Sequence, residues 1–321
     1  MRLVTVKRAD GTTRAGRIEG DEIALLPFAD VGELLESGDA SREAAVEERT
    51  PLAGATLGRL VPHPSKVLCI GLNYMDHIRE GDPDAKGPAF PETFTKFAES
   101  LTGADDDILL PVGSGIADFQ EAIAVAAKLP ILSLPVTSDC VDWEAELVVV
   151  IGTHVYRATA DEAAAAIAGF TIGNDVSVRD WQMHSSQWIP GKAWKGLSPV
   201  GSVLVTADEV GVRPDLQIRC LVDGEVRQDF RTSSIEFGPV ELVSYLSRIV
   251  PLRPGDLIFT GTGQGVGITK DPQVYLQPGQ TMVTELVGIT QAVNRLVAEE
   301  IPQSGGRADA SQPSVLVPDG V

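Results

Sequence analysis

Five consecutive apolar residues near the middle of the chain, Leu147 to Ile151, constrain the fold most strongly, because two glutamates lead directly into them. The stretch reads DWEAELVVVIG over residues 142–152, with Glu144 and Glu146 at its start. Such an apolar run is typical of a buried strand, and residues two apart on a strand share one face. A solvated strand would continue with polar residues, so both carboxylates lie where the strand enters the core. Because an unpaired buried carboxylate costs several kcal/mol, their charge requires compensation.

A third carboxylate, Asp175, ends a second segment, FTIGNDV, which we predict to be another buried strand. Three carboxylates without Cys or His among them are typical ligands of a hard cation, Mg²⁺ or Mn²⁺, with Ca²⁺ as a third option. The spacing of the two glutamates alone leaves a functional and a structural role equally open. Asp175 favours a metal site.

Cationic and amide side chains follow Asp175 closely: Arg179 and Gln182, then Lys192 and Lys195. An arginine can hold a carboxylate through two parallel hydrogen bonds, and a lysine supplies a point charge. Surface ion pairs are the alternative interpretation, which we favour for Lys195. The net charge of −19 means that an anionic substrate needs such a local positive site.

Two further stretches are weaker signals. His77 and Glu80 have an H-x-x-E spacing that places them on one side of a helical turn, where a glutamate can orient a histidine as a general base. A solvated helix turn is the commoner explanation of that spacing. The stretch GTGQGVG, residues 261–267, lacks the spacing of nucleotide-binding loops. We interpret it as a tight loop that lets backbone N–H groups, Thr260 or Thr262 approach a ligand.

Composition excludes several classes of protein. The acidic net charge argues against nucleic acid as a partner. No apolar run approaches the length of a membrane-spanning helix, and the first residues lack the apolar core of a signal peptide. The three cysteines are scattered without a C-x-x-C spacing, so we expect reduced, buried thiols and a cytoplasmic protein.

The chain divides into a small module, residues 1–60, a main body, residues 61–302, and a polar tail, residues 303–321, that we expect to be disordered. Many short strands and turn signals indicate an α+β fold dominated by β-structure. Capping pairs mark three helices, one of which we expect to end at Gly38 and another at Gly169. The pairs are Asp30 with Glu33, Asp118 with Glu121, and Thr159 with Glu162. A further helix is predicted over residues 41–48.

Six stretches, in their order along the chain, resemble the fumarylacetoacetate hydrolase superfamily. They are CIGLNYMDHIRE, DWEAELVVVIG, AGFTIGNDVSVRDWQ, GKAWKGLSPVGS, DGEVRQDFRTS and PGDLIFTGTGQGVG. The resemblance covers residues 66–298 and weakens across 112–135. It implies a mixed β-sandwich or roll catalytic domain with a small N-terminal α+β domain, and assembly as a homodimer.

The resemblance also implies roles for individual residues. The metal ligands would be Glu144, Glu146 and Asp175, and the cation Mg²⁺ or Mn²⁺. His77 and Glu80 would position water on a mobile lid, which we place at residues 75–91. Lys192, rather than Lys195, would be the catalytic lysine, because the family's lysine stands seven residues before the proline matched by Pro199. The implied substrate-binding residues are Arg179, Gln182 and Thr260.

From these roles we expect a metal-dependent hydrolase that cleaves a carbon–carbon bond in a small 2,4-dioxo acid, such as an acylpyruvate or fumarylpyruvate. The family also contains oxaloacetate-type decarboxylases and keto–enol or ene isomerases, which stay open as alternatives. Two features depart from the family pattern. Residues 112–135 look like an insertion, and Gly263 stands where a proline is usual.

Overall fold

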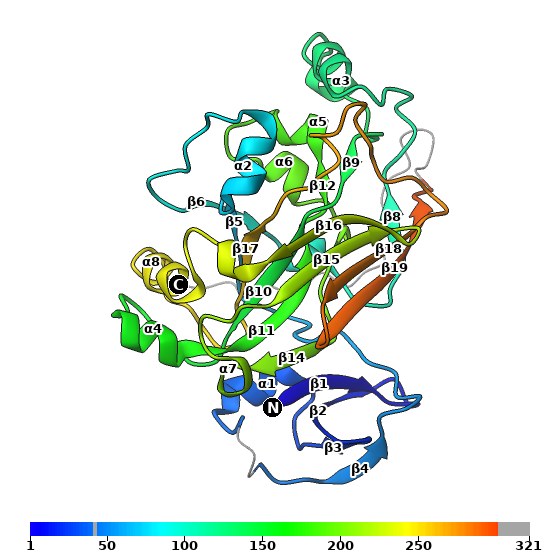
Figure 1. Ribbon diagram of the computed structural model, residues 1–321. Helices are drawn as coiled ribbons and strands as arrows, with labels where there is room; N and C mark the ends of the chain where they lie inside the picture. Colours follow the sequence, from blue (N-terminus) through cyan, green and yellow to red (C-terminus); the bar gives the residue numbers. More distant parts are fainter. Residues whose placement is uncertain (41–43, 301–321) are drawn as a thin grey trace, which may run out of the picture.

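The computed structural model describes residues 1–40 and 44–300, and it is rich in strands and poor in helices (Figure 1). A ten-stranded sheet forms the body. The order of its strands is β4 (Glu48–Pro51), β3 (Glu22–Leu25), β2 (Thr13–Glu19), β1 (Arg2–Lys7), β14 (Val203–Thr206), β11 (Ile167–Asn174), β10 (Ala145–Ile151), β17 (Leu257–Thr262), β5 (Val67–Gly71) and β6 (Glu92–Lys96).

A second, five-stranded sheet packs against the first, and two short strand pairs lie beside them. The five-stranded sheet runs in the order β16 (Glu225–Arg231), β15 (Gln217–Val222), β18 (Thr281–Leu286), β19 (Thr290–Ala298) and β8 (Ile108–Leu110). The short pairs are β12 (Ser177–Val178) with β9 (Val141–Asp142), and β13 (Ser198–Pro199) with β7 (Leu101–Thr102).

The helices are short and lie around the sheets. They are α1 (Val31–Ser37), α2 (Met75–Gly81), α3 (Phe119–Ala126), α4 (Ala160–Ala166), α5 (Arg179–Gln182), α6 (Ile189–Lys192), α7 (Ala207–Val210) and α8 (Pro239–Ser247), with 3₁₀ turns η1 (Ala98–Ser100), η2 (Ile131–Ser133) and η3 (Thr232–Ser234). None of the helices in the described ranges is long and apolar enough to cross a membrane.

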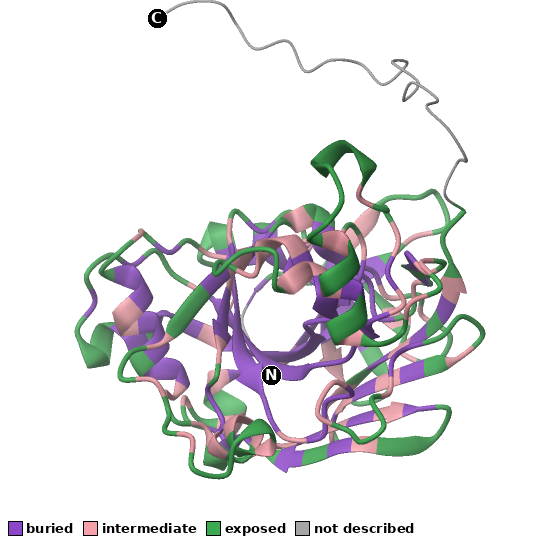
Figure 2. Ribbon diagram, turned by 90° about the horizontal axis from the view of Figure 1, so that it is seen from above, coloured by how far each residue is buried: buried purple, intermediate pink, exposed green. Residues whose placement is uncertain are grey.

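The central strand β10 explains the architecture, because every one of its residues is buried. Leu147 and Val149 join the core shared with the second sheet, where they pack with residues such as Ile218. Val148 and Val150 belong to the core on the opposite face, with Leu34 of α1. Figure 2 shows the buried strands in the middle of the molecule and exposed residues on the helices and loops around them. The prediction of a β-dominated sandwich or roll is confirmed.

Several local predictions are confirmed as well. Asp30, Asp118 and Thr159 accept hydrogen bonds from the backbone N–H three residues on and begin α1, α3 and α4. Gly38 ends α1 with a φ of 75°, a conformation that favours glycine. All three cysteines are free and buried.

Two helix predictions were wrong. Residues 44–47 are not helical and Glu48 begins β4, because this segment pairs with β3 of the same sheet; positions 41–43 lie outside the described residues. The helix of residues 160–166 ends before Gly169, which lies inside β11. A Cβ on Gly169 would lie 2.0 Å from the Val205 carbonyl oxygen, so this glycine serves close strand pairing rather than a helix end.

The N-terminal segment continues the main sheet, because β1 pairs with β14 in an antiparallel register. The region 112–135, expected to be an insertion, carries α3 and η2, and α3 projects at the edge of the molecule (Figure 1). The predicted tail, residues 303–321, lies outside the described residues.

Candidate active site

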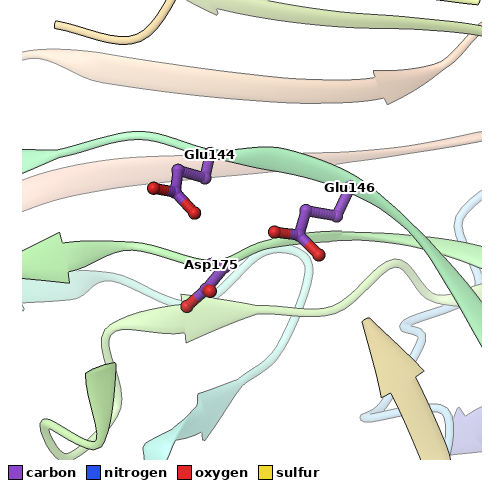
Figure 3. Close-up of side chains that lie close together, drawn as sticks. All are labelled: Glu144, Glu146 and Asp175. Carbon is purple, nitrogen blue, oxygen red and sulfur yellow. The ribbon is translucent and has the colours of Figure 1, made fainter. Parts of the chain in front are cut away.

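Two adjacent strands bring the three predicted carboxylates together. Glu146 lies in β10, and Glu144 is the residue directly before this strand. Asp175 is the residue directly after β11, the antiparallel neighbour of β10. The Asp175 N–H donates to the Glu144 carbonyl oxygen at 2.7 Å, which fixes the two strand ends side by side. Carboxylate oxygens of all three residues lie within 4.8 Å of one another, and all three are buried (Figure 3).

Two of the predicted cations contact this cluster. Lys192, in α6, donates from Nζ to Glu144 Oε2 at 2.7 Å and to Asp175 Oδ2 at 2.9 Å. Arg179, in α5, donates from Nη1 to Glu144 Oε1 at 2.5 Å and to Gln182 Oε1 at 3.1 Å. Burial opposes ionisation of Glu144, but the charges of Lys192 and Arg179 outweigh this effect and lower the pKa of its carboxyl to about 2. Lys195 is exposed, as favoured above.

A third cation, Lys96 in β6, was missed from the sequence. Its Nζ lies 2.6 Å from Asp175 Oδ1, and its side chain is fully buried. The same ammonium group donates to the carbonyl oxygens of Lys192 and Val176. The only signal in the sequence was a lysine at an inward-facing position of a strand. This signal does not reveal that the partner is Asp175, which lies far along the chain.

Glu146 differs from its two neighbours. It accepts a hydrogen bond from the Gly261 N–H at 2.8 Å, but no ion pair among the described residues involves it. Burial and the nearby charges of Asp175 and Glu144 raise the pKa of its carboxyl well above the usual range. A divalent cation would remove this repulsion.

The donor set also fits a hard cation. It consists of carboxylate oxygens, which Mg²⁺ and Mn²⁺ prefer. Asp175 Oδ1 is buried and receives no hydrogen bond of normal geometry, although Lys96 pairs with it. The residues present therefore fit a divalent metal ion.

The predicted His77–Glu80 pair is formed within α2. His77 Nδ1 lies 3.0 Å from Glu80 Oε2, and both side chains are largely buried. The other oxygen, Glu80 Oε1, accepts the backbone N–H of Gly265 at 2.6 Å. Glu80 therefore holds the histidine and anchors α2 to the glycine-rich loop, residues 261–267, at the same time.

That loop binds the protein's own carboxylates. The N–H groups of Gly261, Gly265 and Gly267 donate to Glu146, Glu80 and Asp142, at 2.8, 2.6 and 2.7 Å. We had expected these N–H groups to approach a ligand, so the structure changes the interpretation of the motif. Asp142, like Lys96, was not singled out from the sequence. Its position directly before Trp143 and Glu144 was the available signal.

Two details of the loop differ from expectation. Thr260 is fully buried in β17 and its hydroxyl donates to the Leu147 carbonyl oxygen at 2.9 Å, so the structure does not bring it to the site. Thr262 lines the cavity instead. A Cβ on Gly263 would lie 2.4 Å from Phe230 Cγ, which explains why this position has no room for the family's usual proline.

A cavity of about 90 Å³ joins these groups. One part of its wall is polar and includes the carboxylates, Arg179 and Lys192, and the other part is apolar. The lining residues are Ile70, Gly71, Leu72, His77, Phe94, Glu144, Glu146, Arg179, Gln182, Trp188, Lys192 and Thr262. Two of them, Leu72 and Trp188, have φ values of 53° and 60°, a strained conformation of the kind that gathers at functional sites.

Comparison with known proteins identifies relatives of this chain. The family model described as fumarylacetoacetate (FAA) hydrolase C-terminal matches residues 66–297. A mitochondrial oxaloacetate tautomerase of Bos taurus is 38% identical over 273 residues, which cover 83% of this chain and 79% of that protein.

Solved structures show the same fold. The 5-carboxymethyl-2-hydroxymuconate delta-isomerase of Mycobacterium smegmatis has a TM-score of 0.70 at 30% identity, covering 93% of this chain and 99% of that one. A fumarylacetoacetate hydrolase of Exiguobacterium antarcticum has a TM-score of 0.74 at 29% identity, covering 93% and 100%. This chain belongs to the fumarylacetoacetate hydrolase family.

Proposed function

We propose that this enzyme interconverts the keto and enol forms of a small anionic 2-oxo acid, with oxaloacetate as the first substrate to test. Relatives that are 34–38% identical carry the name oxaloacetate tautomerase, and a structural relative at 30% identity is named as an isomerase. These names favour the isomerase alternative over the carbon–carbon hydrolase that we expected from the sequence.

The observation that carries the proposal is the position of His77 between Glu80 and the cavity. Keto–enol interconversion removes a proton from the carbon beside a carbonyl group and delivers a proton to the carbonyl oxygen. Because Glu80 accepts from Nδ1, the proton sits on Nδ1, and Nε2 is the nitrogen free to exchange a proton. His77 lines the same cavity as Glu144 and Glu146. This position supports a role for His77 as the base and then as the acid.

The polar wall would hold the other end of the substrate. A divalent cation held by Glu144, Glu146 and Asp175 would supply electrostatic stabilisation where negative charge develops. Lys192 uses two of its three N–H donors on carboxylates, which leaves one for an anionic substrate. The Gln182 side chain, held by Arg179, lines the cavity beside it.

The cavity is small, and part of its wall is apolar. Ligand pockets usually occupy about 300–1,000 Å³, whereas this cavity measures about 90 Å³. A cavity of this size favours a small substrate. Apolar side chains, including Phe94 and Trp188, exclude further water and strengthen the electrostatic contacts inside.

A product panel tests the proposal. The Mg²⁺-loaded enzyme is incubated separately with enol-oxaloacetate and with an acylpyruvate. Conversion of the enol is followed by its ultraviolet absorbance, and carbon dioxide and pyruvate release are followed in parallel. We expect fast loss of the enol without matching carbon dioxide release, and no pyruvate from the acylpyruvate. Fast pyruvate release from the acylpyruvate would replace the proposal with a hydrolase, and carbon dioxide release at the rate of enol loss would replace it with a decarboxylase.

A further inference from the structure

We propose that Asp142 is a positioning residue that ties Arg179 to the glycine-rich loop and, through this loop, to Glu80. The proposal rests on the proposed function only for the choice of the assayed substrate. It assigns a role to a buried aspartate that neither holds the metal nor lines the cavity.

Asp142 divides its two carboxylate oxygens between two parts of the site. Oδ2 accepts from Arg179 Nε at 2.9 Å, from Arg179 Nη2 at 2.8 Å and from the Ile268 N–H at 2.9 Å. Oδ1 accepts from the Gly267 N–H at 2.7 Å and from the Trp143 N–H at 2.8 Å. The side chain is 0% exposed, so water cannot replace any of these partners. One carboxylate therefore fixes both the arginine and the end of the loop.

The next residue provides a second attachment to the same loop. Trp143 donates from Nε1 to the Gly265 carbonyl oxygen at 3.0 Å, and the Gly265 N–H donates to Glu80 Oε1 at 2.6 Å. A continuous set of hydrogen bonds thus runs from Arg179 through Asp142, Trp143 and Gly265 to Glu80.

The loop has little freedom to absorb a change at Asp142. A Cβ on Gly265 would lie 2.2 Å from the Arg227 carbonyl oxygen, and one on Gly267 would lie 1.9 Å from the Val274 carbonyl oxygen. A loop packed this closely transmits strain to its neighbours instead of absorbing it. Losing the Asp142 charge would therefore loosen the arginine and displace the N–H group that orients Glu80.

This arrangement predicts a kinetic signature. A looser Arg179 weakens substrate binding and raises KM, and a misplaced Glu80 slows proton transfer and lowers kcat. A residue that only stabilises the fold would change neither constant in the folded enzyme. A double-mutant cycle measures the coupling between Asp142 and Glu80 directly.

The first experiment uses Asp142→Asn, Glu80→Gln and the double variant, each as the full chain with Mg²⁺, assayed on enol-oxaloacetate. We expect each single variant to lose about 10-fold or more in kcat/KM. The kcat/KM of the double variant should lie less than about 3-fold below that of the less active single variant, because the effects of residues in one network are not additive. Multiplied losses in the double variant would overturn the proposal.

Asp256→Asn is the matched control. Asp256 is also 0% exposed, accepts the N–H groups of Lys66 and Arg253, and pairs with the Lys66 ammonium, but it lies away from the cavity. We expect this variant to lower Tm without changing kcat/KM, and the double variant with Glu80→Gln to have the same kcat/KM as Glu80→Gln alone. Equal kinetic losses in Asp256→Asn and Asp142→Asn would reduce Asp142 to a structural residue and overturn the proposal.

A second measurement tests the proposal even if Asp142→Asn does not fold and even if oxaloacetate is not the substrate. Hydrogen exchange is compared with and without oxalate in the Mg²⁺-loaded wild type and in Arg179→Lys, at oxalate concentrations shown by calorimetry to saturate each protein. We expect oxalate to slow exchange at Gly265, Gly267 and Ile268 only in the wild type, because lysine cannot bond to Asp142 through a two-pronged contact. Equal protection in both proteins, or none in the wild type, would overturn the proposal whatever reaction the enzyme catalyses.

Discussion

Lys192 and Glu144 form a buried ion pair, with 2.7 Å between Nζ and Oε2, although 48 residues separate them in the sequence. This pair shows that the carboxylate cluster carries cations of its own. Lys192, Arg179 and Lys96 each contact Glu144 or Asp175, whereas Glu146 has no ion-pair partner among the described residues. The three basic residues offset the charge of two carboxylates, so a divalent cation is needed most beside the third.

Glu146→Gln should therefore reduce Mg²⁺ affinity strongly. We expect a loss of at least about 100-fold, because removal of even an outer partner of a ligand typically costs 10–100-fold. The metal-free Tm should stay the same or rise, since burial of an amide costs less than burial of a repelled carboxylate. Titration calorimetry measures the affinity and differential scanning fluorimetry the Tm. Glu285→Gln, half-buried in β18, is the control and should bind Mg²⁺ normally. Unchanged affinity in Glu146→Gln would contradict the assignment.

Lys96→Met should destabilise the metal-free protein, because it leaves Asp175 without one of its buried counter-charges. Breaking a buried pair by removing one partner typically costs about 3–5 kcal/mol, which urea unfolding measures directly. Lys66→Met is the matched control, since Lys66 also pairs with a fully buried aspartate, Asp256, but is itself 21% exposed. We expect a clearly smaller loss there. Equal losses of unfolding free energy in the two variants would contradict this expectation, because they would mean that the deeper burial of Lys96 does not strengthen its ion pair.

The segment 75–91 should close over the cavity when ligand binds. It contains α2, which Glu80 anchors to Gly265, followed by mostly exposed residues up to Phe90. Trypsin can cleave after Arg79 and Lys86, both exposed. We expect Mg²⁺ with oxalate to slow both cleavages, while cleavage after the exposed Lys128 of the 112–135 region stays unchanged. Equal slowing at all three positions, or none at Arg79 and Lys86, would argue against a lid.

Local signals in the sequence predicted local structure well. The caps at Asp30, Asp118 and Thr159 depend on a residue three positions away, so the chain alone determines them. The helix predicted over 41–48 failed because β3 recruits Glu48 into a sheet, and local propensity cannot anticipate that pairing.

The site shows the same difference between local signals, which the sequence reveals, and contacts between distant segments, which it does not. The carboxylates Glu144, Glu146 and Asp175 were predictable because each ends or begins an apolar run, where an unexplained charge is conspicuous. Lys96 was not, because its role depends on contact with Asp175 across two strands that are distant in sequence. Thr260 shares its face of β17 with Thr262, but it lies further from the strand end, where its hydroxyl donates to the Leu147 carbonyl oxygen and does not line the cavity. Family resemblance supplied the position but not the direction of the side chain.

The most direct test of the account compares wild type with His77→Asn, both loaded with Mg²⁺, for the rate at which enol-oxaloacetate becomes the keto form. If His77 carries the proton, kcat/KM should fall by about 10²–10⁴-fold, the usual contribution of a general base. Mg²⁺ affinity should be unchanged, because the residue is not among the carboxylates of the metal site. His154→Asn, at an exposed position, should retain the wild-type rate. A His77→Asn enzyme that binds Mg²⁺ and converts the enol as fast as wild type would contradict the account.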